Sequence, residues 1–426
     1  MWQLNIKRAL VLGKGLSGIG AKKALEKQGS IVTLCDEKDF TDAIKGDYDI
    51  AVISPSITLK HQIFSWASEK GIEVIGEMEL GSRLCDKPFV AVTGTNGKTT
   101  TVELLGEMLA SKSVCVTGNI GRSFALDACG NYGCFVVETS SFQLESIRSF
   151  KPKVAVITNI SPDHLDRHET LHNYAKIKLQ ILKNQDESDY AILSADDICC
   201  ELVEDIKPRS EVFFVSTKKP VRGAYLLGDK LYLLGKTLCR TREVALNGKH
   251  NIKNALTASL AAKLMGASDE EIKSALSSFK TSNHRLKYLT SVRGVAFYDD
   301  SKGTNVAATL AGMESMPSSF CLILGGSDKG YEYDELFKSA PRTLVKVCVC
   351  GDTAKKILEA AERNNFHNAI ECETMCQAVM EAYKSGADNV LLSPASASFD
   401  KYSSYKERGE DFARIVSEIK DIERRG

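Results

Sequence analysis

Residues 88–101 read PFVAVTGTNGKTTT and combine the residue types that bind a nucleoside triphosphate. An apolar run that ends at Thr93 predicts a buried strand, and a helical pattern begins at Lys98. A glycine loop between a strand and a helix binds phosphate, because backbone N–H groups and the helix dipole both favour an anion there. Lys98 would neutralise the β- and γ-phosphates, and the Thr99 hydroxyl would ligate Mg2+. The alternative is an ordinary strand–helix turn.

This phosphate loop is shorter than the general pattern for such loops. The general pattern has a glycine at the position that Val92 occupies here. We expect ATP to contact the loop and the first helical turn, which comprise Gly94, Thr95, Asn96, Gly97, Lys98, Thr99 and Thr100.

A second glycine loop follows the first predicted strand of the chain. Residues 13–18 read GKGLSG and fit the dinucleotide pattern G-x-G-x-x-G, and Asp36 ends the second predicted strand. An acidic side chain at that spacing can accept a hydrogen bond from a ribose hydroxyl. The pattern suits NAD(P) or FAD, a nucleotide that is not a redox cofactor, or a tight structural turn. The residues alone leave these three interpretations open.

Polar residues in the middle of the chain form further candidate sites. Glu138 follows a predicted strand and could hold Mg2+ directly or through water, although a helix cap would use the same segment. His164 lies among acids in the segment SPDHLD, which favours a metal or acid–base role over a structural one. Lys178 lies in a helical pattern, where a lysine is ordinarily a surface residue.

Three polar segments follow predicted strands in the last third of the chain. Residues 299–305 (DDSKGTN) combine acids, a lysine and hydroxyls, although a helix cap is the alternative. Residues 325–330 (GGSDKG) could bind an anion, and residues 393–400 (SPASASFD) offer hydroxyls to a carboxylate, unless both are surface turns. Arg285, near an expected domain edge, either reaches a phosphate or forms a surface salt bridge.

Strand and helix patterns alternate along the chain and predict an α/β fold with three domains. We place a Rossmann-like domain at 1–87, a central P-loop domain at 88–281 and a second Rossmann-like domain at 282–426. Ligands of open α/β sheets bind beyond the carboxyl ends of the strands. The polar segments described above lie at such positions.

Composition narrows the class of protein. Lys and Arg together number 55, as do Asp and Glu, so the net charge of +0 argues against a nucleic-acid or membrane-surface binder. No apolar run is long enough to span a bilayer, and the N-terminus lacks the apolar core of a signal peptide. The 13 cysteines lack the spacing of a zinc site. We therefore expect reduced thiols and a cytoplasmic protein.

Taken in order, these motifs resemble those of the Mur ligases, the amide-forming enzymes of peptidoglycan synthesis. The resemblance covers essentially the whole chain and rests on GTNGKTT (94–100), GNIG (118–121), ETSSFQLE (138–145), SPDHLDRH (161–168), HR (284–285), DSKGTN (300–305) and SPASASFD (393–400). It implies an ATP-dependent acid–amino-acid ligase that adds D-glutamate to UDP-N-acetylmuramoyl-L-alanine through an acyl phosphate, giving ADP and phosphate. Motifs of sister enzymes, such as Asp-Asn-Pro-Arg and Gly-Ala-Gly-Asp, do not occur.

The resemblance also implies a role for each matching residue. The UDP substrate would contact Gly15, Leu16, Ser17, Asp36, Asn119 and Ser140. ATP would contact, beyond the phosphate loop, Asn251, Arg285 and Asp300. D-Glutamate would contact Thr304, Lys329, Ser398, Phe399 and Tyr405. Two Mg2+ ions would be held by Thr99, Glu138, His164 and a carbamoylated Lys178, and the implied catalytic residues are Lys98, Glu138, His164, Lys178 and Lys302.

Some details of this implied site differ or stay open. A carbamate on Lys178 replaces a cation by an anion, which suits a position beside two Mg2+ ions. Many family members read His-Arg-x-Glu, whereas this chain has Lys287 at the fourth position and keeps Arg285. Either His164 or Asp300 could deprotonate the incoming amine. A site drawn from three domains implies a closure that excludes water from the acyl phosphate.

Three other functions stay open at this level. They are a Mur-type ligase of different amino-acid specificity, an NAD-dependent oxidoreductase built on residues 1–84, and a P-loop protein that hydrolyses ATP to drive a partner. We expect a monomer that acts on small molecules, with no nucleic-acid partner and no membrane insertion.

Overall fold

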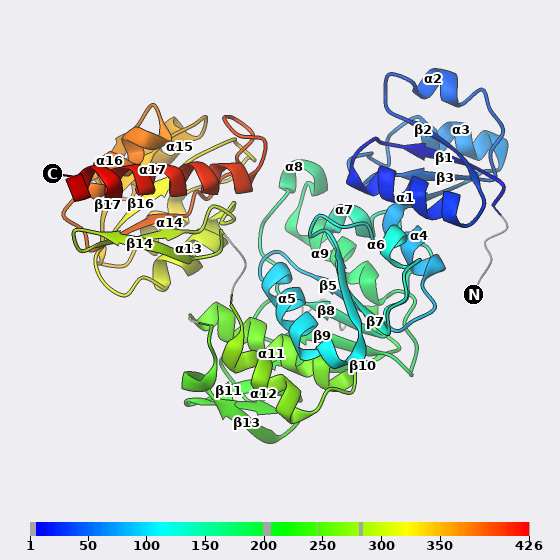
Figure 1. Cartoon of the computed structure of the whole chain (residues 1–426), viewed down its shortest axis with the longest axis horizontal. Helices are drawn as coiled ribbons and strands as arrows, with labels where there is room; N and C mark the ends of the chain where they lie inside the picture. Colours follow the sequence, from blue (N-terminus) through cyan, green and yellow to red (C-terminus); the bar gives the residue numbers. More distant parts are fainter. Residues whose placement is uncertain (1–5, 199–205, 247, 281–283, 426) are drawn as a thin grey trace. The chain divides into compact units, whose positions relative to one another are not determined.

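The computed structural model describes residues 6–198, 206–246, 248–280 and 284–425. Three sheets with flanking helices make up the chain (Figure 1), which confirms the expected α/β class. Contacts divide the chain into two compact units. The first comprises Met1–Ile160 and Thr170–Phe279, and the second comprises Ser161–Glu169 and Lys280–Gly426.

The first sheet of the first unit has four parallel strands in the order β2-β1-β3-β4. The strands are β1 (Arg8–Leu12), β2 (Ile31–Cys35), β3 (Ile50–Ile53) and β4 (Glu73–Gly76). The inner strands β1 and β3 are apolar and almost wholly buried, as expected of a parallel sheet that helices cover on both faces. The helices are α1 (Leu16–Lys27), α2 (Phe40–Ala43), α3 (Ile63–Lys70) and α4 (Glu77–Leu84).

The second sheet of this unit has nine strands in the order β13-β12-β11-β10-β9-β8-β5-β7-β6. The parallel strands are β5 (Phe89–Thr93), β6 (Val114–Gly118), β7 (Cys134–Glu138), β8 (Val154–Ile157), β9 (Tyr190–Ser194), β10 (Glu211–Ser216) and β11 (Gly223–Leu227). Two antiparallel strands complete it, β12 (Lys230–Leu233) and β13 (Lys236–Arg240). Strands β11 and β12 form a hairpin with its turn at Gly228 and Asp229.

Several of the described helices flank the nine-stranded sheet or connect its strands. They are α5 (Lys98–Met108), α6 (Phe124–Asp127), α7 (Ser141–Leu144), α9 (Leu171–Leu179), α11 (Lys249–Leu264) and α12 (Asp269–Ser278), with short 3-10 turns at Ala110–Lys112, Gln180–Leu182 and Thr241–Glu243. Helix α5 packs against α11 on one face of the sheet.

The second unit has one six-stranded sheet in the order β14-β15-β19-β16-β17-β18, parallel except for β14. Its strands are β14 (Lys287–Val292), β15 (Val295–Asp299), β16 (Phe320–Leu324), β17 (Leu344–Val349), β18 (Ala369–Glu371) and β19 (Asn389–Leu392). Its helices are α8 (Leu165–His168), α13 (Val306–Glu314), α14 (Asp334–Lys338), α15 (Ala354–Arg363), α16 (Met375–Tyr383) and α17 (Tyr405–Arg425).

Several elements of the structure were not expected from the sequence. Helix α4 reads EMELGSRL. Its two glutamates face inward and it contains a glycine, so its sequence lacks the apolar inner face that predicts a helix. Strand β14 is an edge strand with mostly exposed residues, so it lacks the alternation of a half-buried strand. The acids of α4 are buried by partners distant in the sequence, whereas β14 pairs with its chain neighbour β15 and lacks a signal because it is little buried.

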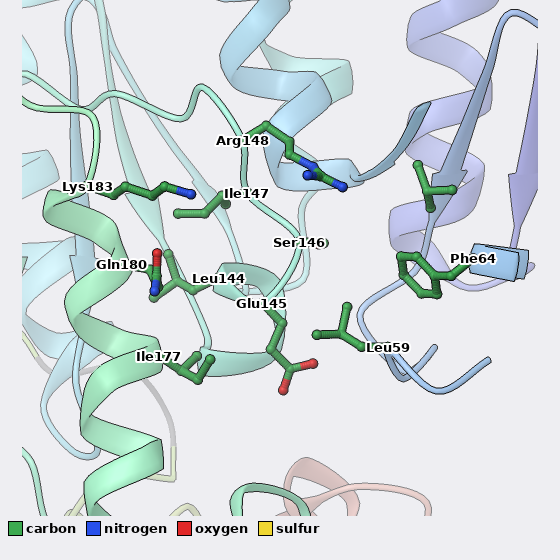
Figure 2. A pocket seen from close by; sticks show the side chains of 11 residues that line it. Leu59, Phe64, Leu144, Glu145, Ser146, Ile147, Arg148, Ile177, Gln180 and Lys183 are labelled. Carbon is green, nitrogen blue, oxygen red and sulfur yellow. The ribbon is translucent and has the colours of Figure 1, made fainter. Parts of the chain in front are cut away.

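A cavity of about 360 Å3 lies inside the first unit, where its two sheet regions adjoin (Figure 2). One side is lined by Leu59, Phe64 and Val74 of the four-stranded region. The other side is lined by Leu144, Glu145, Ser146, Ile147, Arg148, Ile177, Gln180 and Lys183. The two sheet regions are in contact through the packing of α6 against α4 and α1 and of α7 against α4.

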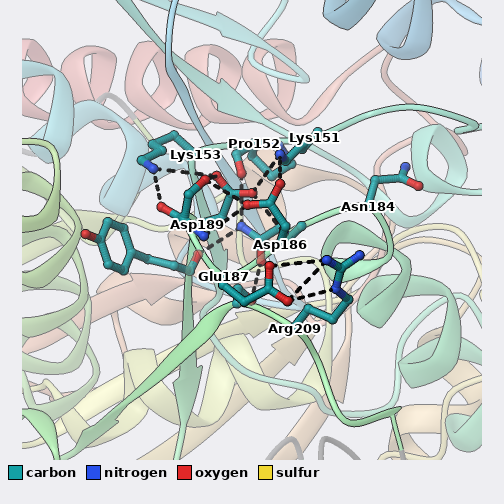
Figure 3. Close-up of polar contacts among 12 residues, drawn as sticks. Lys151, Pro152, Lys153, Asn184, Asp186, Glu187, Asp189 and Arg209 are labelled. Carbon is teal, nitrogen blue, oxygen red and sulfur yellow. Dashed lines mark hydrogen bonds and ion pairs between the residues drawn. The ribbon is translucent and has the colours of Figure 1, made fainter.

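A network of ion pairs lies at the amino ends of β8, β9 and β10 (Figure 3). Lys151 Nζ lies 2.5 Å from Asp186 and 3.3 Å from Asp189, and Arg209 pairs with Glu187 at 3.1 Å. The phosphate loop follows the carboxyl end of β5, which is parallel to β8. The ion-pair network, at the amino ends of the strands, therefore lies at the opposite end of the sheet from the phosphate loop. Arg209 and Glu187 are exposed, and a pair of that kind adds little stability, whereas Lys151 pairs with the buried Asp189; we assign the network no role in the site.

Candidate active site

The phosphate loop has the conformation that its sequence predicts. Strand β5 ends at Thr93 and α5 begins at Lys98. Gly94 and Gly97 adopt φ angles of 141° and 81°, a region that favours glycine. A Cβ atom at Gly97 would also overlap the side-chain oxygen of Asn254, at the start of α11. Both glycines are thus required by backbone conformation and by close packing.

Two residues after β8 hold the phosphate loop in place. Asn159 accepts a hydrogen bond from the Asn96 N–H and donates one to the Asn96 carbonyl, each at 2.9 Å. The Thr158 hydroxyl donates to the same carbonyl at 2.6 Å. The loop is therefore preorganised by the neighbouring strand. Thr158 and Asn159 lie just before the segment SPDHLD, and sequence analysis assigned neither of them a role.

Lys98, Thr99 and Glu138 come together at this loop. Lys98 Nζ donates to the carbonyls of Gly94 and Thr95, each at 2.8 Å. The Thr99 hydroxyl donates to Glu138 Oε2 at 2.7 Å, and both residues are buried. Asn119 Nδ2 donates to Glu138 Oε1 at 3.0 Å and so orients the carboxylate. Hydroxyl and carboxylate oxygens are the donors that Mg2+ prefers, so this pair suits the predicted metal.

Lys178 on α9 lies beneath the phosphate loop and is 1% exposed. Its Nζ donates to the Gly94 carbonyl at 2.9 Å and lies 4.5 Å from the ring centroid of Tyr174. The interpretation of this residue as a surface lysine is therefore wrong. Its local pattern gave no sign of burial, and only the resemblance indicated a functional position.

Two other predicted contacts of the first unit lie at helix starts near this loop. Ser140 is the N-cap of α7 and forms a capping box with Gln143, so its hydroxyl has a structural partner as well as its predicted ligand. Asn251 lies in the first turn of α11, where it accepts a hydrogen bond from Asn254 Nδ2 at 3.3 Å. Asn254, which sequence analysis did not single out, links α11 to Gly97.

The first glycine loop also joins a buried strand to a helix. Gly15 is the N-cap of α1, and a Cβ atom on Gly18 would overlap the Gly13 carbonyl. Leu16 is 68% exposed beside it, and Ser17 is half-buried. Asp36 lies 3.3 Å from Lys14 Nζ. Burial alone would raise the pKa of Asp36, but Lys14 and nearby backbone N–H groups lower it, so Asp36 is an ionised acceptor.

In the second unit, the loops after β15, β16 and β19 are bound to one another. The Ala395 N–H donates to the Gly303 carbonyl at 2.9 Å, and the Ser327 N–H donates to the Ala397 carbonyl at 2.9 Å. Lys302 Nζ lies 5.3 Å from the ring centroid of Tyr405, so these two predicted residues are brought together. The same loops carry Thr304, Lys329, the buried Ser398 and the exposed Phe399.

Asp300 is a buried carboxylate at the start of this loop cluster. It accepts hydrogen bonds from the Ser393 hydroxyl at 2.7 Å and from the Leu286 N–H at 3.2 Å. Burial raises the pKa of Asp300 to about 7, although Ser393 and the positive charge of Arg285 oppose the rise. The buried Arg285 Nε has no hydrogen-bond partner among the described residues, which leaves it available to a ligand.

Arg408 is a residue that sequence analysis missed. Its guanidinium is 2% exposed and donates to the carbonyls of Ser301, Ser396 and Ala397 at 2.8 to 3.2 Å. Burial lowers the pKa of Arg408 to about 10. An arginine in the charged run of α17 carries no sequence signal for such burial.

His164 belongs to the second unit, whereas Glu138 and Lys178 belong to the first. It is the N-cap of α8 with φ of 54°, and its neighbour Asp163 is 6% exposed. Asp163 accepts hydrogen bonds from the Tyr331 hydroxyl and from Asn305 Nδ2, the latter at 3.3 Å. The SPDH segment is thus anchored through Asp163 within the second unit.

The chain is similar in sequence to a family model and to proteins of known name. A family model described as the Mur ligase middle domain matches residues 92–262. The UDP-N-acetylmuramoylalanine--D-glutamate ligase of Caldanaerobacter subterraneus subsp. tengcongensis is 37% identical over 98% of this chain and 100% of its own length. The chain belongs to the Mur ligase family. A Pelotomaculum thermopropionicum protein of the same name is 38% identical over 97% of this chain and 98% of its own length.

Solved structures of a pseudomurein peptide ligase and of a MurF ligase share the fold. A pseudomurein peptide ligase type C from Methanothermus fervidus has a TM-score of 0.64 at 19% identity, covering 97% of this chain and 100% of that chain. The MurF ligase from Thermotoga maritima in complex with ADP has a TM-score of 0.62 at 16% identity, covering 98% and 97%. Because the 37% identity over 98% of the chain places it in the Mur ligase family, the oxidoreductase alternative for the first glycine loop is not favoured. Among the described residues, no helix is long and apolar enough to cross a membrane.

Proposed function

We propose that this Mur ligase joins D-glutamate to UDP-N-acetylmuramoyl-L-alanine at the expense of ATP, giving ADP and phosphate in peptidoglycan precursor synthesis. The observation that carries the proposal is the identity of 37% with a ligase of that name over 98% of the chain. Binding of ADP by the Thermotoga maritima relative supports the use of ATP.

The first unit would activate the carboxylate. Lys98 is positioned at the phosphate loop, where its charge would stabilise the γ-phosphate as the L-alanyl carboxylate attacks it. Thr99 and Glu138 would hold Mg2+, which when bound neutralises charge as the carboxylate and the phosphate meet. The product of this step is an acyl phosphate.

A carbamate on Lys178 is compatible with its surroundings. The carbamate nitrogen keeps one N–H, which can retain the hydrogen bond to the Gly94 carbonyl. The added carboxylate would then extend from a buried position beside the phosphate loop, as a metal ligand. An ammonium at this position would instead repel a second Mg2+ ion.

The second unit would bind D-glutamate through Thr304, Lys329, Ser398, Phe399 and Tyr405, with Lys302 near the reacting carboxylate. The amine of D-glutamate attacks the acyl carbon, and phosphate leaves from the tetrahedral oxyanion. The pKa of Asp300, raised by burial to about 7, suits a group that accepts a proton near neutral pH, and His164 is the alternative base.

Phosphate release with UDP-N-acetylmuramoyl-L-alanine and a panel of amino acids tests the proposal. We expect release only when both substrates are present, and only with D-glutamate among common amino acids. Release without an amino acid would favour the ATP-hydrolysing alternative. Release with a different amino acid would reassign the specificity within the family.

A further inference from the structure

Helix α4, which follows the last strand of the four-stranded sheet, buries two carboxylates. Glu77 is 2% exposed and Glu79 is fully buried. A buried carboxylate is tolerated only when its oxygens are hydrogen-bonded, so the partners of these two residues indicate what they do. The proposed reaction uses neither residue.

Glu79 binds a segment of the nine-stranded region. Its Oε2 accepts the N–H groups of Arg148 and Phe150, and its Oε1 accepts the N–H of Ser149, each at 2.9 Å. The Ser149 hydroxyl and Arg83 Nε also donate to Oε1, at 2.5 and 2.8 Å. Burial alone would raise the pKa of Glu79, but these donors lower it. Glu79 is therefore an ionised anchor held in a nest of consecutive N–H groups.

Glu77 binds a second segment of the same region. Its Oε1 accepts the Ser123 hydroxyl at 2.6 Å and the Ala125 N–H at 2.8 Å. Ser123 is the N-cap of α6, so the bond fixes the start of that helix. Burial raises the pKa of Glu77, which distinguishes it from the ionised Glu79.

The two anchored segments adjoin the predicted substrate loops. Helix α6 directly follows the loop that carries Asn119, whose side chain contacts Glu138. The Arg148–Phe150 segment follows α7, and Ser140 is the N-cap of α7. Figure 2 shows Arg148 and Ser146 of this connection facing the cavity between the two regions.

Helix α6 also packs closely against α1, the helix that begins at the first glycine loop (Figure 1). A Cβ atom on Gly20 of α1 would overlap the Ser123 side chain. On α4, a Cβ atom at Gly81 would lie 2.6 Å from Phe124 Cδ1 and 2.8 Å from the Ala125 nitrogen. These contacts leave no room for α6 to slide between α1 and α4.

We propose that Glu77 and Glu79 are positioning residues, which set the spacing between the first glycine loop and the loops that carry Asn119 and Ser140. The UDP substrate spans this distance, so the correct spacing lets both of its ends bind together. The inference rests on the proposed function, because that function defines the substrate. It concerns the UDP substrate and predicts no direct effect on ATP.

The test compares Glu79→Gln with Glu77→Gln in the full-length protein. Glu79→Gln points an NH2 group at N–H donors, which breaks the nest, and we expect the KM for UDP-N-acetylmuramoyl-L-alanine to rise about tenfold. Glu77→Gln retains one acceptor oxygen for both donors, and we expect a rise of about threefold at most. The KM for ATP should stay within about twofold in both variants, because neither carboxylate contacts the phosphate loop.

Two further variants keep the test decisive. Ser149→Ala removes one donor to Glu79 but leaves the backbone nest intact, so it should fold even if Glu79→Gln does not, with a smaller rise in the same KM. Glu271→Gln is the matched control, because Glu271 also links two segments of the first unit, accepting the Ser268 N–H at 2.7 Å and the Ser111 hydroxyl. Glu271 lies on α12, which contains none of the predicted substrate contacts, so Glu271→Gln should lower only the melting temperature.

The outcomes separate the inference from the proposed function. Turnover by the wild type, with a KM rise confined to the UDP substrate, supports the inference. Turnover by the wild type with KM values that are unchanged, or raised equally for ATP and the UDP substrate, overturns the inference alone. Absence of turnover with UDP-N-acetylmuramoyl-L-alanine in the wild type overturns the proposed function, and the inference with it.

Discussion

The two glycine loops of the first unit each join a buried parallel strand to a helix N-terminus, yet their surroundings differ. The loop at 94–99 lies over the buried Lys178, and Thr99 and Glu138 provide oxygen donors beside it. The loop at 13–18 has one lysine, Lys14, which is half exposed and paired with Asp36 and Asp39. The two loops thus share a backbone arrangement that suits an anion, but of the two only the loop at 94–99 has a buried hydroxyl bonded to a buried carboxylate, a pair that suits Mg2+.

Removal of divalent cations should separate the two loops most sharply. We expect EDTA to abolish phosphate release, because Mg2+ would then no longer offset the repulsion between the substrate carboxylate and the phosphates of ATP. Calorimetry should still detect binding of UDP-N-acetylmuramoyl-L-alanine, since no metal is expected at the first loop. Equal loss of phosphate release and of UDP-N-acetylmuramoyl-L-alanine binding would show that the two loops do not differ in their need for a metal.

Lys98→Ala should have the next largest effect. The variant removes the cation nearest the phosphates, and we expect kcat to fall about 10³-fold. Lys14→Ala is the matched control in the other loop and should change kcat by less than about threefold, since exposed pairs contribute little. A similar loss in both variants would contradict the distinction between the loops.

Lys178→Ala tests the buried group beneath the second loop. We expect a loss of about 10²-fold in kcat, partly restored by added short-chain carboxylates that replace the carbamate. Lys176→Ala, an exposed lysine on the same helix, is the control and should retain activity. Full activity of Lys178→Ala without rescue would exclude a carbamate role.

Alanine substitutions at the two close-packed glycines should affect different substrates. Gly18→Ala overlaps the Gly13 carbonyl, and we expect the KM for the UDP substrate to rise about tenfold or more. Gly97→Ala overlaps Asn254 and strains a positive φ, so it should raise the KM for ATP instead. Steady-state kinetics with each substrate varied in turn would reveal a crossed result, which would reverse our assignment of the loops.

Asp36→Asn should have the smallest effect. It replaces an ionised acceptor for a ribose hydroxyl by a neutral one, and we expect the KM for the UDP substrate to rise about threefold. Asp39→Asn also disturbs Lys14 but removes no predicted substrate contact, so it should leave this KM unchanged. A larger effect of Asp39→Asn would indicate that Lys14, and not Asp36, contacts the substrate.

The predictable parts of the site are those with a local signal. The phosphate loop follows from an apolar strand, positive-φ glycines and a helix start within a few residues, and the structure has these elements where the sequence predicts them. Lys178 and Arg408 have no such signal. Each lies on an amphipathic helix as an ordinary charged residue, and its burial comes from carbonyl groups far away in the chain.

Glu77 and Glu79 illustrate the same limit more strongly. Nothing in the local sequence marks these two glutamates as buried, whereas in the structure they are among the most buried carboxylates. Their hydrogen-bond donors lie at Ser123 and at Arg148–Phe150, on a different sheet region. No local pattern encodes that pairing.

The sequence by itself determined the fold class, both glycine loops and the family, because strand–loop–helix units depend on neighbouring residues and the motifs retain their order. The tertiary structure alone decided which charged residues are buried and what they hold. Burial of a charge is stable only where several distant donors or acceptors converge on it, and only the folded chain brings them together.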